Sequence, residues 1–209
     1  MRRERRWRHW GAGRAVAPRP PAPPPRGAAA LAAARRVLDA DPTVSGLGLA
    51  LYSLRAARGG AKRVAVRLDA RASPTGSPSL ADVSAFSRAF NSALVDALGE
   101  EEAGGVEVEA SSPGADRALR LPADLARFAG LPLAVTPEPG SAAATTLGSS
   151  PAIVTYEGEG QGGPESATFA VADTRATRGP SGKLSAKQRA ARFDCAVGEL
   201  ARVALYVDI

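Results

Sequence analysis

Chemically active side chains gather in a short segment in the middle of the chain, between Ser111 and Arg117. A serine hydroxyl becomes a nucleophile when a neighbouring base takes its proton, and histidine is the usual base. The chain has a single histidine, His9, and the first half holds a single lysine, Lys62. A hydrolase using Ser111 or Ser112 would also need a strained elbow of the G-x-S-x-G type, which this segment lacks. We therefore predict no catalytic residues here and expect the protein not to be an enzyme.

The same segment has the residue order of a tight turn. Proline presets φ at the second turn position, and glycine permits a positive φ at the third. Serine hydroxyls can bind nearby backbone groups and fix the start of the turn. The residues assigned this structural role are Ser111, Ser112, Pro113 and Gly114. The adjacent charged residues Asp116 and Arg117 are the candidate partner contacts, and one of them can anchor the loop while the other points to a partner.

A second chemical feature is cationic. The stretch 175–192 carries six basic side chains and no acidic one. These are Arg175, Arg178, Lys183, Lys187, Arg189 and Arg192. Lysine and arginine bind the phosphates of nucleic acids in a salt-dependent manner. The stretch is therefore the candidate RNA-binding element, and a solvated loop with a short helix is the other interpretation.

The sequence contains no set of residues suited to bind a metal or a cofactor. Structural zinc sites take four cysteine or histidine ligands, and the chain has one of each, Cys195 and His9. No apolar run approaches the ~20 residues that cross a bilayer. We therefore predict no metal, no cofactor and no membrane partner, and we expect a monomer.

Charge is distributed unevenly along the chain. Residues 1–36 hold ten arginines and one acid, whereas the rest holds 17 basic and 20 acidic side chains. The first 28 residues are rich in Arg, Ala and Pro, which is typical of an organelle transit peptide. A disordered basic arm that stays attached and touches RNA is the alternative. We expect location in the chloroplast stroma, with the mitochondrial matrix as the alternative.

Hydrophobic periodicity outlines an N-terminal α/β domain over residues 29–130. The predicted elements are a helix at 31–38, strands at 47–52 and 64–68, a helix at 80–98 and a strand at 106–110. Ser79 and Asp82 form a capping box at the start of the longer helix. This order, helix-strand-strand-helix-strand, fits a two-layer α+β sandwich with the helices on one face of the sheet.

Short strands dominate the remainder, residues 131–209. Apolar runs predict strands at 131–136, 153–156, 167–172 and 200–207. The Gly-, Ser- and Ala-rich residues 137–150 indicate a flexible linker or long loop. Short strands separated by glycine-rich turns suit a small β-barrel domain, with 175–192 as a basic insertion.

The segment VEVEASSPGADRALRLPADLARFAG resembles the signature of the ribosome maturation factor RimP family. The preceding RVAVRLD and SLADVSAFSRAFNSALVDA match that family in order and spacing, so the resemblance covers about residues 46–135. The basic stretch 175–192 resembles an insertion of plastid-type relatives. One departure is Ala118, where the family usually has proline.

The resemblance implies an N-terminal α/β domain, a C-terminal SH3-like barrel and binding to the small ribosomal subunit through ribosomal protein and rRNA. The sequence thus predicts a ribosome assembly factor for the small subunit that acts without catalysis. The alternative is a free-standing RNA-binding module of an organelle that uses the stretch 175–192.

Overall fold

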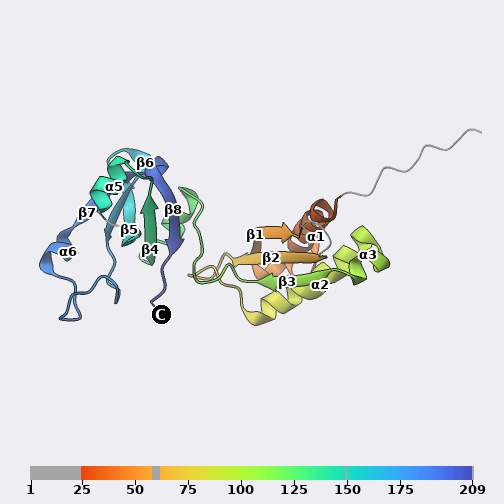
Figure 1. Ribbon diagram of the computed structural model, residues 1–209. Helices are drawn as coiled ribbons and strands as arrows, with labels where there is room; N and C mark the ends of the chain where they lie inside the picture. The colour runs from red at the N-terminus through yellow and green to blue at the C-terminus, as the bar shows by residue number, and fades with distance from the viewer. Residues whose placement is uncertain (1–24, 58–61, 149, 209) are drawn as a thin grey trace, which may run out of the picture.

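The protein forms two α+β units joined at a narrow waist (Figure 1). The computed structural model describes residues 25–57, 62–148 and 150–208. Most of the segment predicted as a leader, residues 1–24, lies outside the described residues. Each unit has its own hydrophobic core.

The first unit contains the predicted order of elements. They are α1 (Arg26–Ala40), η1 (Ser45–Leu47), β1 (Leu49–Ala56), β2 (Arg63–Ala70), α2 (Leu80–Leu98), α3 (Glu100–Gly104) and β3 (Glu107–Ser111). Helix α1 is longer than predicted and begins inside the range 1–28 assigned to the leader. The helix is longer because one of its faces, which consists of small apolar side chains such as Ala30, Ala34 and Val37, is buried.

The first sheet has the order β1-β2-β3, with β1 antiparallel and β3 parallel to β2. Helices α1 and α2 pack together over the core, which includes Val64, Val66 and Phe90. Successive side chains of a strand point to opposite faces. Arg63 and Arg67 alternate with these buried valines and are exposed, so the second face of this sheet is polar.

The predicted capping box of α2 is confirmed. The Ser79 hydroxyl accepts a hydrogen bond from the Asp82 amide at 3.2 Å, and the Asp82 carboxylate accepts one from the Ser79 amide at 3.1 Å. Phe86 and Phe90 stack with ring centroids 5.4 Å apart in the core below. Both local signals, the cap and the apolar period, therefore act on the same helix.

The second unit is built on five strands. Its elements are α4 (Ala123–Arg127), β4 (Pro132–Pro137), α5 (Ala142–Leu147), β5 (Ala152–Gly160), β6 (Gly163–Val171), α6 (Ala186–Ala190), β7 (Arg192–Ala196), η2 (Val197–Glu199) and β8 (Leu200–Leu205). The sheet has the order β7-β6-β5-β4-β8, and all its pairings are antiparallel. The core includes Phe128, Leu133, Phe169 and Val203.

The SH3-like barrel expected here is not supported, because the sheet is not closed. A closed barrel would need β7 to pair with the free edge of β8, but residues 117–119 pair with that edge instead. The Leu119 amide donates to the Val203 carbonyl at 2.8 Å, and the Leu205 amide donates to the Arg117 carbonyl at 2.9 Å. Strand β8 thus fastens the second sheet to the segment that leaves the first.

Two further features of this unit differ from the sequence-based expectations. Residues 137–150 are not wholly a loop, because Ser141 caps the short helix α5 through the Ala144 amide. Leu125 and Phe128, which follow the turn, are buried in the second core rather than the first. The second unit therefore begins before residue 131.

Candidate functional site

A buried ion cluster lies at the waist between the two units. Asp69, at the end of β2, accepts hydrogen bonds from Arg117 at 2.7 and 2.9 Å. Arg127 of α4 donates to the same carboxylate at 2.5 and 2.9 Å, and to the Ala70 carbonyl at 2.9 Å. One carboxylate of the first unit thus binds two guanidinium groups from the segment that enters the second unit.

The Arg117 guanidinium is enclosed by aromatic rings. It lies 5.0 Å from the centroid of Tyr52 and 4.8 Å from that of Phe128. Arg117 is only 2% exposed, and among the described residues its Nε has no hydrogen-bond partner. A buried ion pair adds little net stability over an apolar contact, but removing one partner is costly. The cluster therefore fixes one arrangement of the waist.

The charge state of Asp69 follows from its two partners. Burial alone would raise the pKa of this carboxyl, but the hydrogen bonds from Arg117 and Arg127 outweigh it and hold the pKa well below its ordinary value. Asp69 is therefore ionised throughout the neutral and mildly acidic range.

Gly76 makes room for the cluster. Its φ is +73°, and a Cβ there would lie 2.1 Å from Nη1 of Arg117 and 2.7 Å from Oδ1 of Asp69. Gly114 has a similar φ of +86°, but a Cβ there would meet nothing within 4 Å. A side chain at either position would strain the backbone, but only a side chain at Gly76 would also displace the ion cluster.

We expect Gly76→Ala to lower the free energy of unfolding by more than the ~1–2 kcal/mol that a left-handed backbone costs a non-glycine residue. The added methyl group must also push Arg117 away from Asp69. Gly114→Ala is the matched control and should lose only the backbone part. Urea denaturation of both variants measures the difference, and equal losses would contradict the steric role of Gly76.

Among the residues assigned to the turn, Gly114 has the positive φ predicted for it. Pro113 is buried, and the Ser112 hydroxyl accepts from the Gly114 amide at 3.4 Å. Ser111 is the last residue of β3. Lys62, the lysine considered as a base for these serines, forms an ion pair with Glu102 at 3.2 Å.

The two residues expected to meet a partner have different surroundings. Asp116 is exposed and forms a 2.7 Å ion pair with Arg202 of β8. Arg117 is buried in the ion cluster, and this burial leaves it no surface for a partner. Its expected role as a partner contact is therefore corrected to one of holding the waist.

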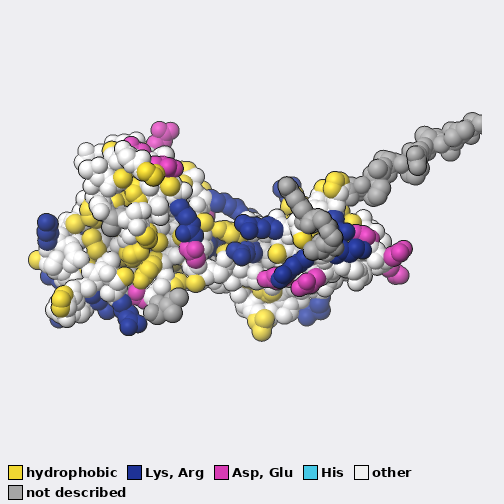
Figure 2. Space-filling model, viewed as in Figure 1, with side chains coloured by type: hydrophobic (Ala, Val, Ile, Leu, Met, Phe, Trp, Pro, Cys, Tyr) yellow, Lys and Arg dark blue, Asp and Glu magenta, His cyan; other side chains and the backbone are white. Residues whose placement is uncertain are grey.

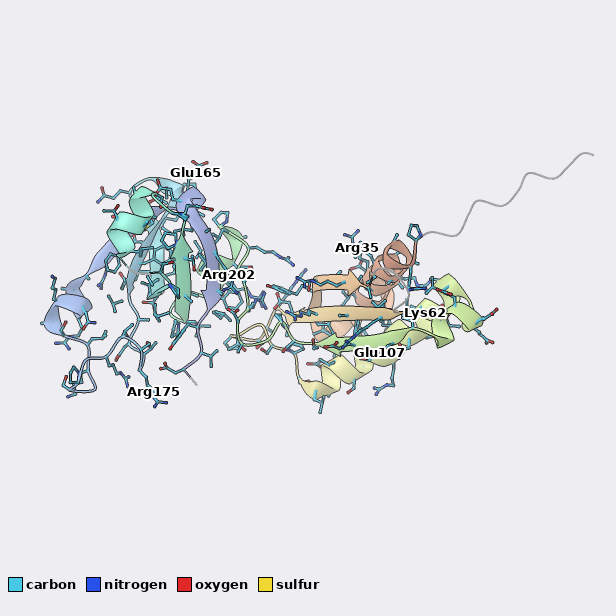
Figure 3. All side chains as sticks on the ribbon, in the orientation of Figure 1. Arg35, Lys62, Glu107, Glu165, Arg175 and Arg202 are labelled. Carbon is cyan, nitrogen blue, oxygen red and sulfur yellow. The ribbon has the colours of Figure 1, made fainter. Side chains whose placement is uncertain are left out.

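The basic stretch 175–192 lies in the second unit, with α6 at the end away from the first unit in Figure 1 and Arg175 at the lower side of the unit in Figure 3. All six of its basic residues are exposed: Arg175, Arg178, Lys183, Lys187, Arg189 and Arg192. Acids outside the stretch neutralise part of it. Arg178 pairs with Asp173 at 2.7 Å, and Arg192 pairs with Glu157 at 2.5 Å. The stretch is therefore less cationic in the folded protein than in the sequence.

Asp69 and Arg127 were not predicted as functional residues. In RVAVRLD, Asp69 alternates in phase with the exposed Arg63 and Arg67, so the strand pattern gives no sign that Asp69 is buried. Burial of an acid demands a cationic partner, but nothing in the local sequence identifies which one.

Two other features are absent from the described ranges. These ranges contain no group of three or more His, Cys, Asp or Glu side chains placed to hold a metal ion. None of the helices in them has the length and apolar character needed to cross a membrane. Cys195 is buried, and this burial raises the pKa of its thiol.

No protein-family model matches the chain, and no curated protein is significantly similar to it.

Proposed function

We propose that this chain is a ribosome maturation factor of the RimP type, which binds a ribosomal protein and rRNA of the small subunit during assembly and performs no catalysis. Its expected place of action is the chloroplast stroma, or alternatively the mitochondrial matrix.

One observation carries this proposal. The separate pieces of the resemblance, RVAVRLD and SSPGADR, meet in space through the 2.7 Å contact between Asp69 and Arg117. Chance matches scattered along a chain have no reason to converge on one buried cluster. The convergence supports the interpretation that these pieces belong to one motif, and hence the assembly-factor function that the resemblance implies.

The architecture is also suited to a binding role. Two small units held at a fixed waist present surfaces from both to one large partner, and the exposed cations are distributed over both units (Figure 2). A free-standing RNA-binding module that uses the stretch 175–192 stays the alternative. It has weaker support, because Asp173 and Glu157 neutralise two of the six cations.

A pelleting assay tests the proposal. The purified full chain is centrifuged through a sucrose cushion with immature small subunits, with large subunits, or with deproteinised rRNA. We expect it to pellet with immature small subunits in preference to large ones. Equal pelleting with all three particles would instead support the free-standing RNA-binding module.

A further inference from the structure

A polar cavity of about 500 Å³ opens beside the buried cluster, between the exposed face of the first sheet and strand β8. Four arginines line it: Arg55 from β1, Arg67 from β2, Arg120 from the segment after the turn, and Arg202 from β8. Figure 2 shows the corresponding gathering of basic side chains at the waist, and Figure 3 labels Arg202 there.

The cavity carries an excess of positive charge. Its one acid is Asp116, so four guanidinium groups face one carboxylate and leave a formal excess of three charges. Asp116 is already paired with Arg202 at 2.7 Å. Within the described part of the chain, Arg55, Arg67 and Arg120 form no ion pair. The cavity thus has the charge that attracts an anion.

The protein holds part of this set in place. Arg120 donates to the carbonyl of Tyr52 at 2.9 Å, and its guanidinium lies 5.6 Å from the Tyr52 ring centroid. Arg67 reaches the Pro113 carbonyl at 3.4 Å. A preordered arginine loses less conformational freedom when it binds a ligand than a lysine on a free surface does.

The arrangement favours phosphate groups repeated along a chain. An arginine side chain presents a planar fork of donors that matches two oxygens of one phosphate. The four arginines come from three strands and one connecting segment on both sides of the waist, so they are spread along the cavity. A polyanion with one charge per unit fits this spread better than a single carboxylate does.

We infer that this junction cavity is an RNA phosphate-binding site, separate from the stretch 175–192. The inference deepens the proposed function, because that function supplies the rRNA. Its test is nevertheless independent, since it measures binding to isolated RNA rather than to a subunit.

The test is the salt dependence of binding. A fluorescein-labelled single-stranded oligoribonucleotide of mixed sequence is titrated with the full chain at several salt concentrations, and anisotropy is measured. Each phosphate contact to single-stranded nucleic acid contributes about 0.7 to the slope of log K against log salt. We expect Arg55→Gln/Arg67→Gln to reduce the magnitude of this negative slope by about 1.4. Arg55→Gln alone, which removes no hydrogen bond to a described residue, should reduce it by about 0.7.

The matched control is Arg35→Gln/Arg88→Gln. It removes the same charge from two exposed arginines of α1 and α2, which lie on the other side of the sheet. The inference predicts a slope close to that of the unaltered protein. Equal reductions in both double variants would overturn it, because they would show only an effect of net charge.

Two further arms complete the test. Lys187→Gln/Arg189→Gln probes the stretch 175–192, and a slope that changes only in this variant would overturn the junction site in favour of that stretch. A poly-glutamate peptide replaces RNA in the second arm. Binding of this peptide, but not of RNA, with loss in Arg55→Gln would overturn the inference and assign the cavity to an acidic protein.

Discussion

Replacing Asp69 by alanine should lower the free energy of unfolding by about 3–5 kcal/mol, the usual cost of removing one partner from a buried ion pair. The substitution leaves the guanidinium of Arg117, which is 2% exposed, in the protein interior without its carboxylate. Arg127 loses the same partner. Urea denaturation followed by circular dichroism measures the loss.

Asp116→Ala is the matched control for Asp69→Ala. It also removes one carboxylate from an arginine at 2.7 Å, but this pair is exposed. Exposed pairs contribute about 0–1 kcal/mol, so the control should lose no more than that. Similar losses in the two variants would contradict the role of the buried cluster.

Asp69→Ala should also make the waist accessible to protease. Trypsin cleaves after arginine, and in the native protein Arg117 is buried. We expect native-state cleavage after Arg117 to be faster in Asp69→Ala than in the unaltered protein, and unchanged in Asp116→Ala. This readout separates opening of the waist from a general loss of stability.

The lowered pKa of Asp69 fixes the pH range of these effects. A carboxylate with a depressed folded-state pKa contributes stability that is fully present above its unfolded value, near 3.9, and is lost as the pH falls through its folded value. The difference between Asp69→Ala and the unaltered protein should therefore stay constant from neutral pH to about pH 5. It should shrink only in stronger acid.

The second large effect is expected for Phe128→Ala, at about 3–5 kcal/mol for loss of a buried phenylalanine. Phe128 is fully buried, packs in the second core and lies 4.8 Å from the guanidinium groups of both Arg117 and Arg127. Its removal leaves a cavity in the core and also takes away one wall of the ion cluster. Urea denaturation gives the cost.

Phe86→Ala provides the comparison for Phe128→Ala. Phe86 is equally buried but lies in the first core, against Phe90. Both variants should lose comparable stability, whereas only Phe128→Ala should accelerate tryptic cleavage after Arg117. Equal cleavage in both would show that Phe128 supports its own core but not the waist.

Local sequence signals predicted the first unit well, because its elements are specified by neighbouring residues. The helix from Leu80 to Leu98 has an apolar period and a capping box within its own sequence. The hairpin of β1 and β2 likewise joins strands that are adjacent in the chain. The turn glycine, Gly114, is determined by the positive φ that the turn requires.

The contacts at the waist and the topology of the second sheet could not be predicted from such local signals. Asp69 is 48 residues from Arg117 and 58 from Arg127 in sequence, so their contact depends on how the two units fold. Strand β7 was not predicted, and the barrel was expected to close. Closure depends on which segment takes the free edge of β8, and here that segment is 117–119. The arginine cavity is likewise assembled from four separate segments.

Sedimentation of the native protein tests the assembly-factor proposal most directly. A chloroplast extract is resolved on a sucrose gradient, and the chain is followed by antibody alongside the rRNA of the small-subunit precursor. The proposal predicts that the chain is found in the precursor fractions, and that it moves to the top of the gradient after the RNA is digested. A chain that stays at the top before digestion, with precursors present in the gradient, would contradict it.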